Sequence, residues 1–408
     1  MSRVEIKLAD LCEVITKGTT PSNIGAEFTE DGIKYIRSEM LTSSKYITED
    51  GFLYISEDTH NKLKRSQLKA GDILFSMAGV YLGKTAILRE CDVPSNTNQA
   101  VALIRVIPEK CNREFVYYYL NLPEVVKSVN SITGQAAQPN INLKQIGSIP
   151  ILLPSREIQD QIVFLVSAYD DLIENNQKQI KLLEEAAQRL YKEWFVDLRF
   201  PGHETTPITD GIPEGWEDKV MEDLCDSIGG GTPSTKNDEY YRDGQIKWVT
   251  PTDITRKNGL ILLDTEKKIT EEGLQHSSAK MVPPYTILMT SRASVGFFGL
   301  CEHEVCTNQG FISCIPYKEN TRYYLLYNLM NRVDEIRAKA SGSTFLEISK
   351  KNFRGLRIVL PTDSVLDEFT KLVFPMVRQM ETLTKSIATL QEARDRLLPK
   401  LMNGEIEV

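Results

Sequence analysis

Two long apolar seams with the same spacing constrain this chain more than any other feature. The first seam begins at Ile162 and ends at Trp194. Its residues lie alternately four and three positions apart, and Asn176 is the one polar residue among them. That spacing is the period of a coiled coil rather than of an ordinary amphipathic helix. Adding 207 to each position gives a second seam in the same register, from Phe369 to Leu401. The chain therefore contains one long helix twice, the first copy predicted over about 158–195.

The seams predict a helix pair. Twofold packing makes two equivalent helices antiparallel, and about 36 residues at 1.5 Å per residue give a rod of roughly 54 Å. Core packing of both seams against globular domains is the alternative. Asn176 either sets the register of the pair or faces solvent. The seam residues expected to pack are Ile162, Val166, Tyr169, Ile173, Ile180, Leu183, Leu190, Phe369, Val373, Met380, Leu383, Ile387, Leu390 and Leu397.

Pro375 falls inside the second copy of the helix. Proline has no amide to donate to the carbonyl four residues earlier. The sequence therefore predicts either a kink at Pro375 or a helix that begins close to it.

The segment in front of each helix is repeated as well. LADLCEVITKGTTPS matches MEDLCDSIGGGTPST, the segment Tyr35-Ile36-Arg37-Ser38 lies opposite Lys247-Trp248-Val249-Thr250, and Thr97-Asn98-Gln99 matches Thr307-Asn308-Gln309. Each copy of the Thr-Asn-Gln segment precedes an apolar strand and a tyrosine-rich helix, at 115–120 and 323–329. Short β-rich runs such as KTAIL, AVALIRVI, GFISCI and LRIVL mix with these helices, so each globular part is predicted to be α+β.

The expected architecture is thus one globular-plus-helix unit used twice, with pseudo-twofold symmetry. A length of 408 residues suits two globular domains plus extended elements. The segment PGHETTPITDGIPEGW, rich in Pro, Gly and Thr, is the expected linker. The predicted segments are a first globular domain at 1–155, a first helix at 156–200, the linker with a second globular domain at 201–361, and a second helix at 362–408.

Charge is distributed unevenly over these segments. Residues 1–155 carry 17 basic and 17 acidic side chains and residues 214–361 carry 19 and 20, whereas residues 156–197 carry 5 and 9 and residues 362–408 carry 6 and 8. The net charge of −8 therefore belongs mostly to the helices. Attraction of nucleic-acid phosphates to the neutral globular parts would need local basic patches.

Cytoplasmic location is the expectation. No apolar run approaches the roughly 18 residues that span a bilayer, and the N-terminal residues have no secretory-signal pattern. The seven cysteines at irregular spacing indicate reduced thiols. Cys301, His303 and Cys306 lie within six residues, but a strand with small buried thiols is preferred over a metal site there, so no metal is predicted.

Motifs of enzyme active sites are not found. The chain has no phosphate-binding glycine loop, and its four histidines lie in no metal or nucleophile-base pattern. Val282-Pro283-Pro284-Tyr285 is similar to the Pro-Pro-Tyr core of adenine methyltransferases, but valine cannot accept a hydrogen bond from a flipped base. No catalytic residue and no cofactor is predicted in this chain.

Several segments together carry a resemblance. LYKEWFVDLRFPGHE, GIPEGWE, the paired GTTPS and GGGTPS segments and the closing LLPKLMNGEI resemble the DNA-specificity subunit of type I restriction-modification systems, over essentially the whole chain. The resemblance implies two target-recognition domains that each read half of a bipartite, gapped sequence in double-stranded DNA, and an antiparallel helical spacer that fixes the gap. It also implies two modification subunits that use S-adenosylmethionine and possibly two restriction subunits that use ATP and Mg²⁺.

Base-contacting residues do not transfer from the resemblance, because recognition domains that read different bases differ in sequence. Polar or basic residues in variable loops are the candidates, because such side chains reach base edges or phosphates. For each of them a solvated surface position is the alternative. The candidates in the first domain are Lys17, Thr19, Thr20, Lys62, Lys64, Arg65, Gln135, Gln138 and Asn140. Those in the second domain are Thr232, Ser234, Arg256, Lys257, Arg292, Ser343, Thr344, Lys350 and Lys351.

Tyr191, Trp194 and Phe195 place three aromatic rings at the end of the first helix. They are candidates for a partner interface, with core packing against the second domain as the alternative. Two other functions also stay open at this stage: a protein-interaction scaffold without a DNA role, and a stand-alone methyltransferase or nuclease.

Overall fold

The computed structural model describes residues 3–42, 44–47, 51–132, 139–256, 259–342 and 345–408. The chain forms two compact units, one made of Met1–Ile173 with Thr389–Val408 and the other of Glu174–Ala388. Each unit therefore combines one globular part with portions of both long helices. The limits of the four predicted segments stay predictions.

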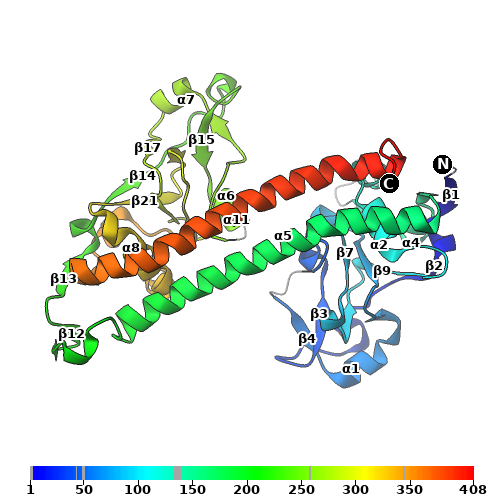
Figure 1. Cartoon of the computed structure of the whole chain (residues 1–408), viewed down its shortest axis with the longest axis horizontal. Coiled ribbons are helices and arrows are strands. Elements are labelled where there is room, and N and C mark those ends of the chain that lie inside the picture. The colour runs from blue at the N-terminus through cyan, green and yellow to red at the C-terminus, as the bar shows by residue number, and fades with distance from the viewer. Residues whose placement is uncertain (1–2, 43, 48–50, 133–138, 257–258, 343–344) are drawn as a thin grey trace. The chain divides into compact units, whose positions relative to one another are not determined.

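Unit 1 holds two four-stranded sheets and a two-stranded pair (Figure 1). The first sheet has the order β2-β9-β6-β7, the second β4-β3-β8-β5, and β1 pairs with β10. All strand pairs are antiparallel except β3 with β8. The strands are β1 (Val4–Lys7), β2 (Cys12–Lys17), β3 (Ile33–Ile36), β4 (Leu53–Ile55), β5 (Gln67–Leu68), β6 (Ile73–Ser76), β7 (Thr85–Ile87), β8 (Ser95–Thr97), β9 (Val101–Val106) and β10 (Pro150–Leu153).

Four short helices complete the globular part of unit 1: α1 (Glu57–Lys62), α2 (Arg113–Leu120), α3 (Pro123–Ile132) and α4 (Leu143–Gly147). Asn112 caps α2 by accepting a hydrogen bond from the Glu114 amide at 2.8 Å. Residues 115–120 of this helix are all buried, as expected of a helix that is apolar on every side. α2 and the inner strands β6 and β9 contribute to one hydrophobic core.

Unit 2 repeats each of these sheets and adds the two-stranded pair β11–β12. Its sheets have the orders β14-β21-β18-β19 and β16-β15-β20-β17, β13 pairs with β22, and the one parallel pair is β15 with β20. The predicted internal repeat is thus confirmed in the order and direction of the strands. The strands are β11 (Ile208–Thr209), β12 (Ile212–Pro213), β13 (Glu217–Val220), β14 (Cys225–Gly229), β15 (Ile246–Val249), β16 (Lys268–Ile269), β17 (Met281–Val282), β18 (Ile287–Thr290), β19 (Phe298–Gly299), β20 (Val305–Thr307), β21 (Phe311–Pro316) and β22 (Arg357–Leu360).

The helices of unit 2 also follow the repeat. They are α6 (Pro251–Thr255), α7 (Glu271–Gln275), α8 (Arg322–Asn331), α9 (Val333–Ala338) and α10 (Lys350–Arg354). α8 is the second tyrosine-rich helix and α10 corresponds to α4. The expectation of an α+β fold is confirmed as a mixture of helices and sheets in each unit.

The two long helices are α5 (Arg156–Tyr191), followed by a π-helical turn at Lys192–Val196, and α11 (Asp363–Asn403). α11 continues through Pro375, so the alternative in which the helix begins near this proline is wrong. Residues Val365, Leu366 and Phe369 in the turns before it are buried in the core, which holds them helical despite the missing amide. The kink stays a prediction.

Within each unit the two helices contact one another in opposite chain directions. In unit 1, Arg394 of α11 donates to Asp170 of α5 at 2.6 Å, and the start of α5 lies against the end of α11. In unit 2, Asn176 donates to Ser386 at 3.2 Å, and Tyr191 packs against Phe369. All the predicted seam residues are buried or half-buried. Many of them pack in the same cores as the globular parts, so the alternative of core packing applies to part of each seam.

The seam of unit 1 includes a buried ion pair that yields a stability prediction. The Asp170 side chain is 5% exposed, and it accepts from Tyr118 at 2.6 Å in addition to Arg394. Asp170→Asn removes the buried negative charge and leaves the Arg394 guanidinium with only Asp395, whose side chain is 63% exposed, as its ion-pair partner. We expect unit 1 to lose about 3–5 kcal/mol of unfolding free energy, measured by urea denaturation.

Glu392→Gln is the matched control, because it breaks the exposed pair between Glu392 and Arg396 on the same helix. Exposed pairs contribute less than about 1 kcal/mol. Equal effects of the two substitutions would contradict the role given to the buried pair.

Candidate nucleic-acid interface

Four loops meet in unit 1, and we call them the loop cluster: residues 17–20 after β2, 76–79 after β6, 97–100 between β8 and β9, and 139–142 before α4. Main-chain hydrogen bonds join them. The amide of Thr19 donates to the carbonyl of Thr97 at 3.0 Å, that of Met77 to Ala100 at 2.8 Å, and that of Ile141 to Met77 at 2.9 Å. Loops held in this way present their side chains from a fixed frame.

Unit 2 contains the same loop cluster at residues 229–232, 290–293, 307–310 and 346–349. The amide of Gly231 donates to Thr307 at 2.9 Å, that of Ser291 to Gly310 at 2.7 Å, and that of Ile348 to Ser291 at 3.0 Å. These three bonds correspond one to one with those of unit 1. The frame is therefore repeated along with the sheets.

A glycine makes the central contact of each frame possible. A Cβ on Gly18 would lie 1.9 Å from the Thr97 carbonyl oxygen, and one on Gly230 would lie 2.1 Å from that of Thr307. Both distances are far shorter than any van der Waals contact, so any larger residue would push the two loops apart. The glycines of GTTPS and GGGTPS are thus explained by a close backbone approach.

Side chains reinforce the same contact in both units. The Thr20 hydroxyl donates to the Gln99 amide oxygen, and the Thr232 hydroxyl donates to that of Gln309. The Tyr35 hydroxyl donates to the Thr19 carbonyl at 3.1 Å. Burial raises the pKa of Tyr35 to about 12, which keeps this donor protonated. In unit 2 the Trp248 indole donates instead, to the Gly231 carbonyl at 2.9 Å.

Gln99 and Gln309 are exposed at the same place in the two clusters, and neither was among the sequence candidates. Each amide can both donate and accept, which suits the edges of bases. The repeated Thr-Asn-Gln segment was the signal that could have identified them.

Five of the first-domain candidates gather in this region. Lys17 and Asn140 line one cavity, Thr20 contacts Gln99, and Arg65 lies 3.4 Å from the hydroxyl of Thr19. The remaining candidates are placed elsewhere or are not placed. Lys62 pairs with Asp58 at 2.5 Å, Lys64 is exposed on a short 3-10 helix, and Gln135 and Gln138 lie outside the described residues.

The cavity of unit 1 has a volume of about 690 Å³ and lies along the loop cluster. Lys17 and Lys144 are its charged lining residues, with Gln99, Asn140 and Gln145 among its polar ones. No carboxylate belongs to the described residues that line it. The cavity is therefore suited to an anionic or hydrogen-bonding ligand.

The second domain presents different side chains on the same frame. Arg292 takes the place of Ala78, and its partner Glu347, at 3.8 Å, takes the place of Asn140. The Arg292 guanidinium also lies 5.8 Å from the ring centre of the exposed Phe345. Thr232, Ser234, Lys350 and Lys351 are exposed in or beside this cluster, and Arg256 is exposed at the end of α6; Lys257, Ser343 and Thr344 lie outside the described residues.

The aromatic residues at the end of α5 belong mainly to the core of unit 2. Tyr191 is 4% and Trp194 8% exposed, and both pack against Phe369. For these two residues the structure favours the alternative of core packing. Phe195 is half-buried and lines a surface hollow with Trp216, so its contact with a partner stays a prediction.

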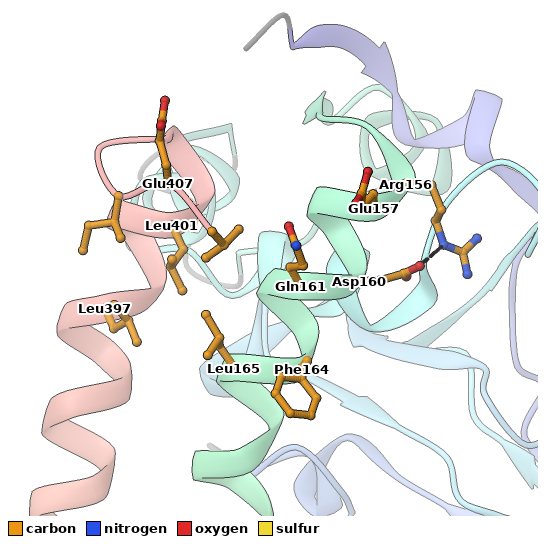
Figure 2. A pocket seen from close by; sticks show the side chains of 11 residues that line it. Arg156, Glu157, Asp160, Gln161, Phe164, Leu165, Leu397, Leu401 and Glu407 are labelled. Carbon is orange, nitrogen blue, oxygen red and sulfur yellow. Dashed lines mark hydrogen bonds and ion pairs between the residues drawn. The ribbon is translucent and has the colours of Figure 1, made fainter.

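A second hollow in unit 1 is an apolar groove of about 880 Å³ between α5 and α11 (Figure 2). Leu165, Leu397 and Leu401 line it, and Phe164 beside them is 76% exposed. Glu157, Asp160 and Glu407 supply carboxylates around it, and Asp160 pairs with Arg156 at 2.9 Å. An exposed apolar groove with such a rim is typical of a protein interface.

The segments that resembled reactive sites have structural roles. Cys301 and Cys306 are buried, whereas His303 is mostly exposed beside Glu302. The Tyr285 hydroxyl contacts Glu381 at 2.9 Å, which ties the Pro-Pro-Tyr segment to α11. Within the described ranges, no group of three or more His, Cys, Asp or Glu residues could hold a metal ion. No helix within those ranges is long and apolar enough to cross a membrane.

Comparison with known proteins identifies one family. The family described as "Type I restriction modification DNA specificity domain" matches residues 2–185 and again residues 213–391. The two matches cover most of the chain and coincide with its two repeats.

Curated relatives match over nearly the full length. The specificity subunit of the type I restriction enzyme MjaIX from Methanocaldococcus jannaschii is 24% identical and covers 98% of this chain and 93% of its own. That of the HindI enzyme from Haemophilus influenzae is 26% identical, over 84% of this chain and 88% of its own. A crystal structure of the type I restriction-modification S subunit from M. genitalium has the same fold, with a TM-score of 0.57, 15% identity and coverage of 98% and 96%.

The close glycine contact gives a prediction for the frame. Gly18→Ala forces the loop away from Thr97 and weakens the bond from the Thr19 amide. The loss of about 1 kcal/mol corresponds to roughly five-fold faster hydrogen exchange at that amide.

Gly355→Ala serves as the control, because a Cβ there lies 3.5 Å from the Lys351 carbonyl oxygen, an ordinary contact. Unchanged exchange of the Thr19 amide in Gly18→Ala would show that the close approach does not hold the frame.

Proposed function

The chain belongs to the family of type I restriction-modification DNA specificity proteins, and from this premise we propose that it is the non-catalytic subunit that selects the DNA sequence for a restriction-modification complex. The observation that carries the proposal is the repeated loop cluster. Both units hold the same hydrogen-bonded frame and present different side chains on it, such as Ala78 against Arg292. A repeated frame with different side chains suits the reading of two different half-sequences.

Each unit would read one half of a bipartite, gapped target in double-stranded DNA. Gln99 and Gln309, fixed by Thr20 and Thr232, are the amides best placed for base edges. The basic candidates around them would contact phosphates, which orient the protein without reading sequence. Since the two frames correspond but their exposed side chains do not, the two half-sequences are expected to differ.

The long helices would set the distance between the two half-sequences as an antiparallel coiled coil. The seam spacing supports this, as do the contacts from Asp170 to Arg394 in unit 1 and from Asn176 to Ser386 in unit 2. From the first contact to the second, the residue in α5 lies later in the chain and its partner in α11 lies earlier. Asn176 is 9% exposed and bonds across the seam, which suits a residue that fixes register.

Two modification subunits would dock on the helices, one on each copy of the repeat. The apolar groove beside Phe164 and Leu165 is the proposed dock in unit 1 (Figure 2). Leu372, at the equivalent position in α11, is 47% exposed and marks the second dock. The occupant would be an amphipathic segment with basic flanks, because carboxylates surround the groove.

The methylation and cleavage reactions would be carried out by the partner subunits. S-adenosylmethionine would be bound by the modification subunits, and ATP with Mg²⁺ by restriction subunits where these join. The complex would act in the cytoplasm, where its DNA target lies.

The spacer can be tested by lengthening it. One heptad inserted after Lys181 in α5 and a matching heptad after Glu381 in α11 preserve the seam and add about 10 Å, or roughly three base pairs. We expect the gap in the methylated motif to grow by about three base pairs while both half-sequences stay the same. Sequencing of methylated adenines in cells that express the complex measures both.

A heptad inserted in α5 alone is the control, since it shifts one seam against the other and should abolish assembly. Altered half-sequences in the double insertion would contradict a passive spacer.

The docks can be tested by stoichiometry. Phe164→Glu places a charge in the groove of unit 1, and we expect native mass spectrometry to find one modification subunit per chain instead of two. Leu372→Glu should give the same ratio, and the two together none.

Ile208→Glu is the matched control, because Ile208 is also half exposed but lies in the β11–β12 hairpin. Two modification subunits on both single variants would refute the proposed docks.

A further inference from the structure

Each loop cluster has a lysine beside the end of its first sheet strand, but the lysine comes from a different element in each unit. Gly18 and Gly230 make the same close contact, so Lys17 before Gly18 corresponds to Gly229 before Gly230. At the neighbouring helix the residues are exchanged: Leu143 begins α4, and Lys350 begins α10. Unit 1 thus has its lysine on the strand, and unit 2 has its lysine on the helix.

Contacts indicate that both lysine side chains lie beside the end of the same strand of the repeat. A Cβ on Gly229 would lie 3.3 Å from Nζ of Lys350, so this lysine extends over the end of β14. In unit 1, Lys17 at the end of β2 and Leu143 line the same cavity. The space that the Lys350 chain fills in unit 2 is therefore the space beside the strand end from which Lys17 extends in unit 1.

A second lysine accompanies the first in both units. Lys144 in α4 corresponds to Lys351 in α10, and both are exposed. None of these four lysines forms an ion pair with a residue in the part of the chain that the structure describes. Lys17 and Lys144 line one cavity, and Lys350 and Lys351 are neighbours on α10. Like charges in one region repel one another, so the placement of these lysines has no evident role in stability. Bound anions would neutralise them.

We propose that Lys17 and Lys144 in unit 1, and Lys350 and Lys351 in unit 2, each hold a backbone phosphate of the half-site that their unit reads. The proposal rests on the proposed DNA function and adds the position of the phosphate. Lysine binds phosphate as a point charge and needs no fixed direction of approach. The lysine can therefore come from the strand in one unit and from the helix in the other, provided that its ammonium group reaches the phosphate.

The test measures binding of duplex DNA that carries the methylated motif by the full complex with its modification subunits, across a range of salt concentrations. Loss of one phosphate contact lowers the salt slope of log Kd by about 0.9. The salt concentration rises fourfold from 50 to 200 mM, and for each protein we take the ratio of Kd at 200 mM to Kd at 50 mM. This ratio should be about 3.5-fold smaller for Lys17→Gly and for Lys350→Leu than for the wild type.

Relocation of the charge is the decisive variant. Lys17→Gly with Leu143→Lys copies unit 2 into unit 1, and Lys350→Leu with Gly229→Lys copies unit 1 into unit 2. Gly229 has no left-handed backbone that would resist a side chain. Both double variants should recover the wild-type salt slope, and the methylated motif should stay unchanged in every variant.

Lys17→Arg controls for the fold, because it retains the charge and should retain the slope, and thermal unfolding checks each complex. Wild-type slopes in Lys17→Gly and Lys350→Leu would overturn the proposal, and so would relocated lysines that restore nothing in folded complexes. If the wild-type complex shows no salt-dependent binding to DNA, the proposed function itself fails.

Discussion

The close approach of two backbones in each unit underlies the whole candidate interface. Gly18 and Gly230 let the loop after the first sheet strand reach the carbonyl of Thr97 or Thr307, and the next amide then closes a hydrogen bond. The loop after β6 or β18 bonds to the same segment, and the loop before α4 or α10 bonds in turn to that loop. Because the frame is made of main-chain bonds, the side chains on it can differ between units without changing it. That separation of frame from side chains is what a protein that reads two different sequences needs.

Sequence reasoning succeeded where the signal was periodic or repeated. The seams predicted both long helices, and the paired segments predicted a duplicated unit whose strand orders agree. Where the outcome depended on packing, the sequence left alternatives open: a helix start near Pro375 is wrong because α11 continues through it, and the burial of Tyr191 and Trp194 favours their packing in the core. Sequence reasoning missed Gln99 and Lys144, since only the fold brings loops and helices from distant parts of the chain together. A comparison of the repeated Thr-Asn-Gln segments, position by position, would have pointed to Gln99.

Acidic and basic side chains lie in different parts of this chain. The acid excess lies on the helices, where carboxylates surround an apolar groove, whereas the cavity beside the loop cluster of unit 1 has lysines and no described carboxylate in its lining. Net charge alone would argue against contact with DNA. The local distribution of charge reconciles a net charge of −8 with a DNA-binding role. Salt screens the distant carboxylates, so a DNA phosphate is attracted mainly by the charges close to it.

The central claim is that two units in one chain read two half-sequences at a fixed separation. The most direct measurement is a genome-wide map of methylated adenines in cells that express this chain with modification subunits, compared with cells that express the modification subunits alone. The account predicts one motif with two different specified halves around an unspecified gap of constant length, present only with the chain. A continuous motif, or the same methylation without the chain, would contradict it.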